Sequence, residues 1–515
     1  MSTGSTKSGG RNRSRSNDGD PGKINISGLD QPEDGSAPQM EMWTWQLVSV
    51  LVLILAAVVR LYALELNPLH HDEGVNGFFL INLINNGIYK YDPANYHGPT
   101  LYYVALLVAK VLKRFGFGLS TYGIRLVPVL FGVATVWLVL LLRRRIGMAG
   151  SLTGAALVAL SPGAVYMSRY FIHESLFVFF TLGIIVASLR YYDSANPVYL
   201  LLASVSAALL FATKETAMIS AGVLLIALAL SLVYVRLRKD SNAEIRAESR
   251  KRQIRRQARP MPPVDSSEGC ARFGGPGMVA MWLLAAIMLF VSVYILFYSS
   301  FFTYSQGFSD SLKTFEIWAK TGKKEHVHEW FTYLSWLWEE EAALLALGAA
   351  GALLALWHAR HRFAVFAALW AGGIIAAYSL IPYKTPWLTL NFIIPLAITG
   401  GYGVDVMYRR AAGDQEVRAL VLALLSAALI FCGYQMVQLN FRHYDDERYV
   451  YPYAHTVREV FPLIDQVNRF AASTGMGKQI TISITSPDYW PLPWYLREYK
   501  HAGYSGRIIV SDERW

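Results

Sequence analysis

Apolar stretches follow one another along most of the chain, separated by short polar breaks. A helix needs about 20 apolar residues to cross the hydrocarbon core of a bilayer. Trp and Tyr occur at many stretch ends, where their amphipathic rings favour the membrane interface. The pattern therefore predicts an α-helical polytopic membrane protein with eleven transmembrane helices. The predicted spans are 43–64, 124–142, 149–167, 174–190, 198–212, 216–235, 278–302, 339–357, 363–381, 387–407 and 418–438.

Charge decides how a twelfth apolar piece, 98–118, is placed. Its apolar part covers only about 14 residues, too few to span. If it lies on the membrane as an interfacial helix, four basic clusters fall on the side of the N-terminus. Cytoplasmic loops carry the excess of Lys and Arg, so this arrangement predicts a cytoplasmic N-terminus and an extracytoplasmic C-terminus. The clusters are Arg143–Arg145, the loop 236–259, the segment 358–362 and Arg409–Arg410.

The overall composition agrees with a membrane protein, since 54% of the 515 residues are hydrophobic and only 16% are charged. We expect a disordered cytoplasmic tail at 1–40, which is too polar for a signal peptide. The transmembrane domain follows at 41–438, in the plasma membrane. Its predicted loops are 65–123 and 303–338 outside and a basic loop at 236–277 inside. The two cysteines, in a basic loop and an apolar run, do not predict a disulfide.

A different kind of sequence follows the last span. Residues 453–473 have apolar positions at helical spacing, 478–485 alternate like a strand, and 506–511 predict a second strand. Between the strands lies the Pro-aromatic segment SPDYWPLPWYLREY. We therefore predict a small extracytoplasmic α/β domain at 439–515.

This topology places five polar motifs on the outer face. The first, HHDEG, carries His71, Asp72 and Glu73 at the end of the first span. Ionisable groups at a membrane are costly and are functional candidates by default. The alternative is that the acidic pair only caps a helix beginning near Gly74. The other four motifs are SRYFIHES at 168–175, TKET at 213–216, YKTPW at 383–387 and the segment 440–515.

Charged residues recur in the turns of these motifs. They include Arg169, His173 and Glu174, then Lys214 and Glu215, and finally Lys384. The alternatives are a local ion pair between Arg169 and Glu174 and snorkelling lysines. Together, however, cations and carboxylates on one face suit a phosphate and an acid–base reaction.

Weaker signals complete the set of candidates. His97, just before a Gly-Pro pair, is expected to line the same cavity. The HVH triplet at 326–328 has metal-ligand spacing but lies in a predicted loop. The basic loop is expected to attract anionic lipid headgroups. A loop tethered to a membrane argues against nucleic-acid binding.

Several of these segments together resemble the GT-C class of multi-span glycosyltransferases, which use polyprenyl-phosphate-linked sugars. The pattern is similar to the protein O-mannosyltransferases and the aminoarabinose transferases of lipid A. A narrower resemblance, carried by YPYAHTV and SPDYWPLPWYLREY, is to a prokaryotic family labelled "flippase activity-associated". The broader resemblance covers most of 43–410. It is carried by HHDEG, HGPTLYY, IRLVPVLFG, SPGAVYMSRYFIHESL and the lysine before the tenth span.

The resemblance implies an inverting hexosyl transfer from a polyprenyl-phosphate sugar to a hydroxyl of a protein, lipid or glycan acceptor. Asp72 and Glu73 would be the catalytic residues, with Asp72 as the general base. Lys214, Lys384 and Arg169 would stabilise the departing phosphate. Glu73, His71 and Glu174 would orient the substrates. Asp72, Glu73 and Glu174 are also candidate ligands for Mg²⁺ or Mn²⁺, whereas His would suit Zn²⁺. In the second turn, related enzymes often have Asp where this chain has His173-Glu174.

Two other functions stay open at this point. A lipid-linked sugar flippase or transporter is one, but transporters tend to show broken helices with ionisable groups near the bilayer midplane and repeated halves. The other is a non-catalytic membrane subunit of a glycan assembly system, with the WPLPWY segment as its contact surface.

Overall fold

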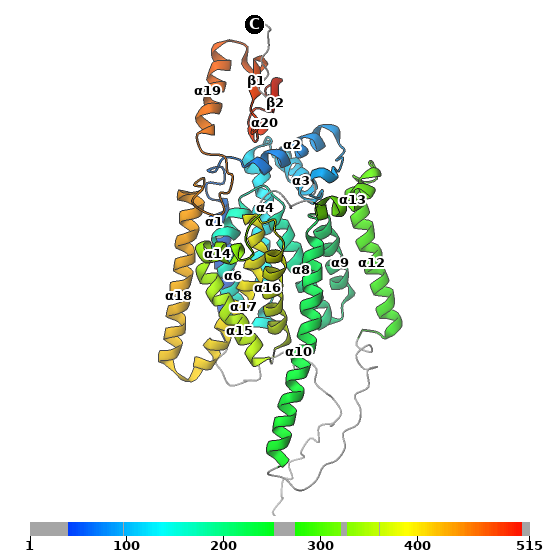
Figure 1. Cartoon of the computed structure of the whole chain (residues 1–515), viewed down its shortest axis with the longest axis vertical. Helices are drawn as coiled ribbons and strands as arrows, with labels where there is room; N and C mark the ends of the chain where they lie inside the picture. The colour runs from blue at the N-terminus through cyan, green and yellow to red at the C-terminus, as the bar shows by residue number, and fades with distance from the viewer. Residues whose placement is uncertain (1–39, 96, 252–272, 321–326, 360, 507–515) are drawn as a thin grey trace, which may run out of the picture.

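The computed structural model describes residues 40–95, 97–251, 273–320, 327–359 and 361–506. It is almost entirely helical, with two short strands near the C-terminus (Figure 1). The elements are α1 Met42–Leu61, α2 His71–Asn86, α3 Thr100–Arg114, α4 Thr121–Leu140, α5 Arg143–Ile146, α6 Met148–Leu160, α7 Pro162–Ser168, α8 Glu174–Ser194, α9 Pro197–Phe211, α10 Ala217–Lys251, α12 Pro276–Tyr298, α13 Gln306–Lys320, α14 Thr332–Glu340, α15 Ala342–His358, α16 Arg362–Leu380, α17 Leu390–Arg410, α18 Gln415–Val437, α19 Val460–Ser473, β1 Thr481–Thr485, α20 Leu492–Tyr495 and β2 His501–Ser505.

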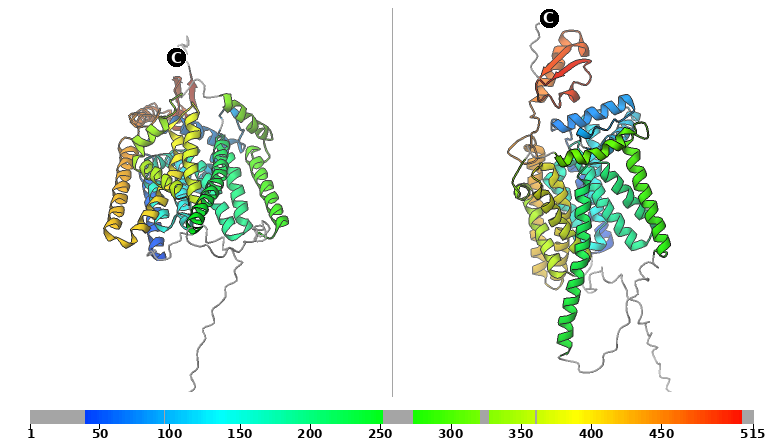
Figure 2. Two further views of the ribbon diagram at one scale, coloured as in Figure 1. Left: turned by 60° about the horizontal axis from the view of Figure 1, so that its bottom comes forward. Right: turned by 45° about the vertical axis from the view of Figure 1, so that its right-hand side comes forward.

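The long helices stand side by side, and α2 and α3 lie at one end of the bundle (Figure 1). The C-terminal unit, α19 to β2, sits beyond α2 at the same end (Figure 2). We call this the capped end. The loop between α17 and α18 lies at the opposite end.

Every predicted span falls on an apolar helix. In the described part of the chain, eight helices are long and apolar enough to cross a membrane, or ten if each bent pair is one span. The pairs are α6 with α7, bent by 61°, and α14 with α15, bent by 115°. Helix α9 is shorter, at 15 residues. The multi-pass architecture is thus confirmed, and the count of eleven spans stays a prediction.

Helix α17 is the centre of the bundle, and 78% of its span is buried. Membrane helices have no hydrophobic driving force to associate, so small residues let their backbones pack closely. Gly348 and Gly351 on α15 meet the backbone of α17, and a Cβ at Gly351 would overlap the carbonyl of Thr399. On the other side, Gly150 of α6 faces Gly401. The core therefore depends on glycine contacts between α6, α17 and α15.

Helix α3 corresponds to the predicted interfacial segment. It buries Thr100, Leu101, Tyr102 and Ala105 and exposes Leu107 among other apolar residues. Its 15 residues make it too short to qualify as a span. Its position relative to a bilayer stays a prediction.

One predicted boundary differs from the structure, at the start of the basic loop. The segment predicted to leave the membrane as a loop at residue 236 is still helical, because α10 continues to Lys251. Its charged residues follow good helix formers, without a Gly or Pro to end the helix. Residues 252–272 and the predicted tail, up to residue 39, lie outside the described residues.

The C-terminal unit has the predicted α/β character, with shifted boundaries. Helix α19 begins at Val460 and not at 453, because the preceding residues pack on the bundle, with Tyr451 and His455 buried. The second strand is His501–Ser505, parallel to β1. The predicted strand at 506–511 falls almost entirely on residues 507–511, which lie outside the described range.

We expect Gly351→Ala to lower the thermal unfolding midpoint of the purified protein, since the added methyl meets a backbone carbonyl. Overpacking of this kind costs about 1–3 kcal/mol. Gly372→Ala is the matched control on α16, because a Cβ there meets no heavy atom within 4 Å. Equal midpoints for the two variants would contradict close packing of α15 on α17.

Candidate active site

Four chain segments meet at the capped end, as the placement of the polar motifs predicted. The amide of Gly98 donates to the carbonyl of Thr213 at 3.0 Å. The side chain of Asn76 on α2 donates to the carbonyl of Phe171 at 2.9 Å, and His173 contacts the carbonyl of Gly98 at 3.2 Å. The start of α2, the turn before α3, the turn after α7 and the turn before α10 thus form one polar cluster.

A fully buried ion pair lies at the base of this cluster. The guanidinium of Arg125 on α4 donates to both oxygens of Glu73, at 2.8 and 2.6 Å. Those oxygens also accept from the amides of His70 and Phe171. Neither side chain exceeds 1% exposure. Glu73 is one of the two predicted catalytic residues, and in the structure its carboxylate is fully engaged by these four hydrogen bonds.

Arg125 extends this anchor into the loop after α1. Its remaining donors reach the carbonyls of Leu64, Asn67 and Pro68 at 2.9–3.0 Å. One guanidinium therefore fixes both the loop and the first turn of α2. Arg125 was not among the predicted site residues, although an arginine inside the predicted span 124–142 is a signal of a buried polar contact.

His70 presents Asp72 to the solvent. Its Nδ1 accepts from the amide of Asp72 at 3.0 Å, and its Nε2 donates to the carbonyl of Tyr453 at 3.1 Å. With Glu73 bonded back to the amide of His70, this is a capping box, as the capping alternative proposed. The side chain of Asp72 is 41% exposed, and the N-terminus of a helix favours its negative charge.

Tyr170 is a further functional candidate that the sequence analysis did not select. Its hydroxyl is buried and has no hydrogen-bond partner among the described residues. Burial raises the pKa of the phenol well above its usual value, and the carboxylate of Asp72 adds to the rise. An unpaired donor beside Asp72 is available to a ligand.

A second charged group surrounds Lys214. Its ammonium lies 2.6 Å from Glu174, and both side chains are about 5% exposed. Burial alone would lower the pKa of Lys214, but the charges of Glu174 and Glu215 outweigh it and raise the pKa. Lys214 is therefore a permanent cation at the floor of the site.

His97 connects this group to the solvent. Its Nδ1 lies 3.2 Å from Glu215, and its side chain is 32% exposed. Burial alone would raise the pKa of Glu215, but His97 and Lys214 lower it. His97 lines the same site, as expected from the sequence.

His173 behaves differently from His97. Burial, His97 and Lys214 all lower its pKa well below the usual value, so the ring is neutral. Its Nδ1 has no partner among the described residues, while its Nε2 donates to Gly98. The free Nδ1 can accept a hydrogen bond from a hydroxyl of a ligand.

Two predicted phosphate ligands have local partners. Arg169 donates to the carbonyls of Val59, Arg60, Tyr62 and Ala63 and so caps the end of α1. The three donors of Lys384 reach the carbonyls of Ser379, Ile381 and His328 at 2.7–3.4 Å. Both cations therefore stabilise turns, in place of the phosphate contacts predicted for them.

The carboxylates proposed as metal ligands do not gather. Glu73 is held by Arg125 and Glu174 by Lys214, while Asp72 stands apart at the surface. The described residues include no group of three His, Cys, Asp or Glu that could hold a metal ion. In the HVH triplet, His326 lies outside the described range and His328 packs against Trp336. These side chains do not fit a metal site, and no chemical step below uses one.

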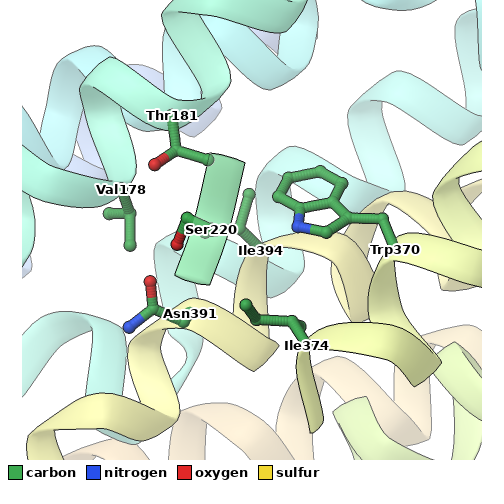
Figure 3. Close-up of a pocket in the computed structure, with 7 residues that line it drawn as sticks. All are labelled: Val178, Thr181, Ser220, Trp370, Ile374, Asn391 and Ile394. Atoms are coloured by element: carbon green, nitrogen blue, oxygen red, sulfur yellow. The ribbon is translucent and has the colours of Figure 1, made fainter. Parts of the chain in front are cut away.

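Beneath the charged cluster, a small pocket lies between α8, α10, α16 and α17. Thr181 lies two turns beyond Glu174 on α8, and Ser220 lies in the first turn of α10 after Lys214. Ser220 and Asn391 direct polar atoms into it (Figure 3). The pocket lies on the bundle side of the ion pairs. Its lining is completed by Val178, Trp370, Ile374 and Ile394.

The fold can now be compared with solved structures. The ArnT of Cupriavidus metallidurans bound to undecaprenyl phosphate aligns over 90% of this chain and 86% of its own, with 14% identity and a TM-score of 0.55. The oligosaccharyltransferase AglB of Archaeoglobus fulgidus, in complex with an inhibitory peptide and a dolichol-phosphate, aligns over 90% of this chain, with 15% identity and a TM-score of 0.55. The protein has the GT-C fold.

One protein-family model also matches part of the sequence. Residues 96–243 match the family described as dolichyl-phosphate-mannose-protein mannosyltransferase. That segment contains His97, His173, Glu174 and Lys214. No curated protein matches the chain. The chain spans 64% of the length of AglB.

We expect Arg125→Met to destabilise the GT-C domain strongly, because it leaves the carboxylate of Glu73 buried without its cation. Breaking one partner of a buried pair costs about 3–5 kcal/mol. Thermal unfolding of the purified protein would show a large fall of the midpoint. The double variant Glu73→Gln/Arg125→Met should recover part of it, because no buried charge remains. A single variant as stable as the wild type would contradict the anchoring role.

Proposed function

We propose that this protein is a membrane glycosyltransferase that moves a sugar from a polyprenyl-phosphate donor to an acceptor hydroxyl at the capped end. The observation that carries the proposal is the site itself. It combines a half-exposed carboxylate, Asp72, with a buried cation, Lys214, and unpaired polar groups on Tyr170 and His173. The GT-C fold and the mannosyltransferase match support the same activity.

The solved relatives support a lipid-linked donor. ArnT was captured with undecaprenyl phosphate and AglB with a dolichol-phosphate, both of which are polyprenyl-type phosphates. In this chain, the charged cluster around Lys214 and His97 lies at the capped end of the helical bundle, near the start of α8 and α10. A donor could thus keep its lipid in the membrane and bring its phosphate and sugar to Lys214 and His97.

Asp72 is the proposed general base. Its carboxylate takes the proton of the acceptor hydroxyl as that oxygen bonds to the anomeric carbon of the sugar. The bond from this carbon to the phosphate oxygen breaks, and the polyprenyl phosphate leaves with the electron pair. Attack opposite the leaving group inverts the anomeric centre, through an oxocarbenium-like transition state. Attachment to the anchored first turn of α2 holds the base in place.

Negative charge develops on the departing phosphate, on the side of the sugar opposite to Asp72 and the acceptor. Cations on that side would stabilise this charge. Lys214 uses one of its three donors on Glu174, which leaves two for phosphate oxygens. His97, held by Glu215 and partly exposed, is the second candidate. We assign the phosphate to these two residues in preference to Arg169, which donates to four carbonyls at the end of α1, and to Lys384, whose ammonium reaches three carbonyls. Glu174 and Glu215 then position the two cations.

We also infer that the capped end is extracytoplasmic. Arg409 and Arg410 at the end of α17 lie at the opposite end of the bundle, and so does the extension of α10 (Figure 1). Basic residues mark the cytoplasmic side. Acceptors would therefore approach from outside the cell membrane.

Asp72→Asn should lower transfer by at least about a hundredfold, the range expected for loss of a general base. The assay follows release or transfer of label from a panel of radiolabelled polyprenyl-phosphate sugars. The unfolding midpoint should not change, because the amide nitrogen of residue 72 still donates to His70 and the side chain is partly exposed.

Asp92→Asn is the matched control, since that exposed carboxylate in the same loop only accepts a local bond from the amide of Ala94. Wild-type turnover in Asp72→Asn would exclude it as the base. Donor binding by the wild type without any turnover, for every acceptor offered, would favour transport or a non-catalytic role.

Cysteine labelling tests the orientation. With Cys270 and Cys432 replaced by serine, Ser473→Cys on α19 should react with a membrane-impermeant maleimide added to intact cells. Gln415→Cys, at the first residue of α18, should react only after the membrane is opened. Both positions are exposed. The reverse pattern would place the active site inside the cell.

A further inference from the structure

The C-terminal unit places its Pro-aromatic segment, residues 486–499, against α2. A Cβ on Gly74 would lie 2.7 Å from the side chain of Pro491, and one on Gly77 would lie 2.5 Å from the ring of Trp494. Glycine therefore stands on α2 at both places where the segment makes contact. The segment approaches within one turn of Asp72 along the same helix.

Three polar contacts fix the segment to separate parts of the GT-C domain. The indole of Trp494, only 1% exposed, donates to the hydroxyl of Thr121 at 3.0 Å. Arg497 donates to the carbonyl of Leu119 at 2.9 Å, and Tyr495 accepts from the amide of Leu69 at 2.8 Å. The segment is thus a fixed wall of the site, although it lies more than 350 residues further along the chain.

Two residues of this wall remain available at its surface. The ring of Trp490 is half-buried, with its centroid 6.2 Å from that of His71 and 6.0 Å from that of Phe78. Asp488 is exposed and acts electrostatically on His71. Burial lowers the pKa of His71, whereas Asp72 and Asp488 both act to raise it. Trp490 and Asp488 therefore border the proposed base through His71.

We propose that Trp490 and Asp488 form the acceptor subsite and that the acceptor is a carbohydrate. A pyranose ring has an apolar C–H face that stacks on an aromatic ring, and its hydroxyls bind carboxylates. An indole and a carboxylate beside a general base match both properties of one sugar residue. This inference rests on the proposed transferase activity and names its acceptor class. The same chemistry suits a free oligosaccharide or the sugar of a glycolipid.

The test uses the full-length protein with three variants, Trp490→Ala, Trp490→Phe and Asp488→Asn. Glu498→Gln is the matched control, because it removes an exposed carboxylate of the same segment that faces Lys478 and not α2. Acceptors are a free oligosaccharide, a glycolipid with the same terminal sugar, and a Ser/Thr peptide. Release of sugar to water without acceptor reports on the donor site alone.

Trp490→Ala should raise the KM for carbohydrate acceptors about tenfold or more, because the apolar face of the sugar loses its aromatic contact. Donor hydrolysis should change much less than this KM, and any fall of the unfolding midpoint should be largely recovered in Trp490→Phe, which restores packing on α2. Trp490→Phe should recover most of the affinity, and Asp488→Asn should raise the KM to a smaller extent. If the enzyme uses the free oligosaccharide, the acceptor is a soluble carbohydrate. If it uses only the glycolipid, the acceptor sugar belongs to a lipid. An unchanged KM in Trp490→Ala, or a peptide as the better acceptor, would overturn the inference.

Equilibrium binding of the same two carbohydrates, without donor, separates this inference from the proposed function. Binding that is lost in Trp490→Ala and kept in Glu498→Gln would support the subsite even if no donor were turned over. Turnover of a donor with no carbohydrate binding at Trp490 would support the transferase and reject the subsite.

Discussion

The buried pair of Glu73 and Arg125 is the interaction on which the site depends. Two charges without solvent are costly unless each is fully paired and hydrogen-bonded. Here the guanidinium meets both carboxylate oxygens and three carbonyls, and the carboxylate accepts two further amides. The hydrogen bonds of this pair connect α2, α4, the loop after α1 and the turn after α7. Asp72 lies one residue from this junction, so its position is set by the pair.

The charged residues of the capped end therefore divide into two sets. Arg125, Arg169 and Lys384 donate to backbone carbonyls in turns, and all three side chains are buried away from water that could replace them. Asp72, His97 and Lys214 keep exposed surface or unused donors. The second set can face a ligand because the first set stabilises the backbone around it. Glu174 and Glu215 link the two sets, because Glu174 holds Lys214 in place and Glu215 holds His97 in place.

Much of this could be predicted from the sequence. The apolar stretches located the helices, and the placement of polar motifs predicted that residues 70–73, 97, 168–175 and 213–216 would meet. Sequence could not separate the two sets of charges, because the partners of Arg169 and Lys384 are carbonyls that carry no residue identity. Tyr170 was not predicted to be functional, and Trp490 was considered only as part of the WPLPWY contact surface, since an aromatic residue near a membrane is ordinary. The strand His501–Ser505 depends on its pairing with β1, which a local pattern does not specify.

The docking of the Pro-aromatic segment has a consequence for how the protein is made. The amide of Leu69 and the glycine face of α2 are synthesised early, whereas Tyr495 and Trp494 emerge some 400 residues later. During synthesis the rim of the site has only part of its wall. A nascent or shortened chain thus has its bundle helices before it has this wall beside α2. The wall is added only when residues 486–499 have been synthesised and have packed on Gly74 and Gly77.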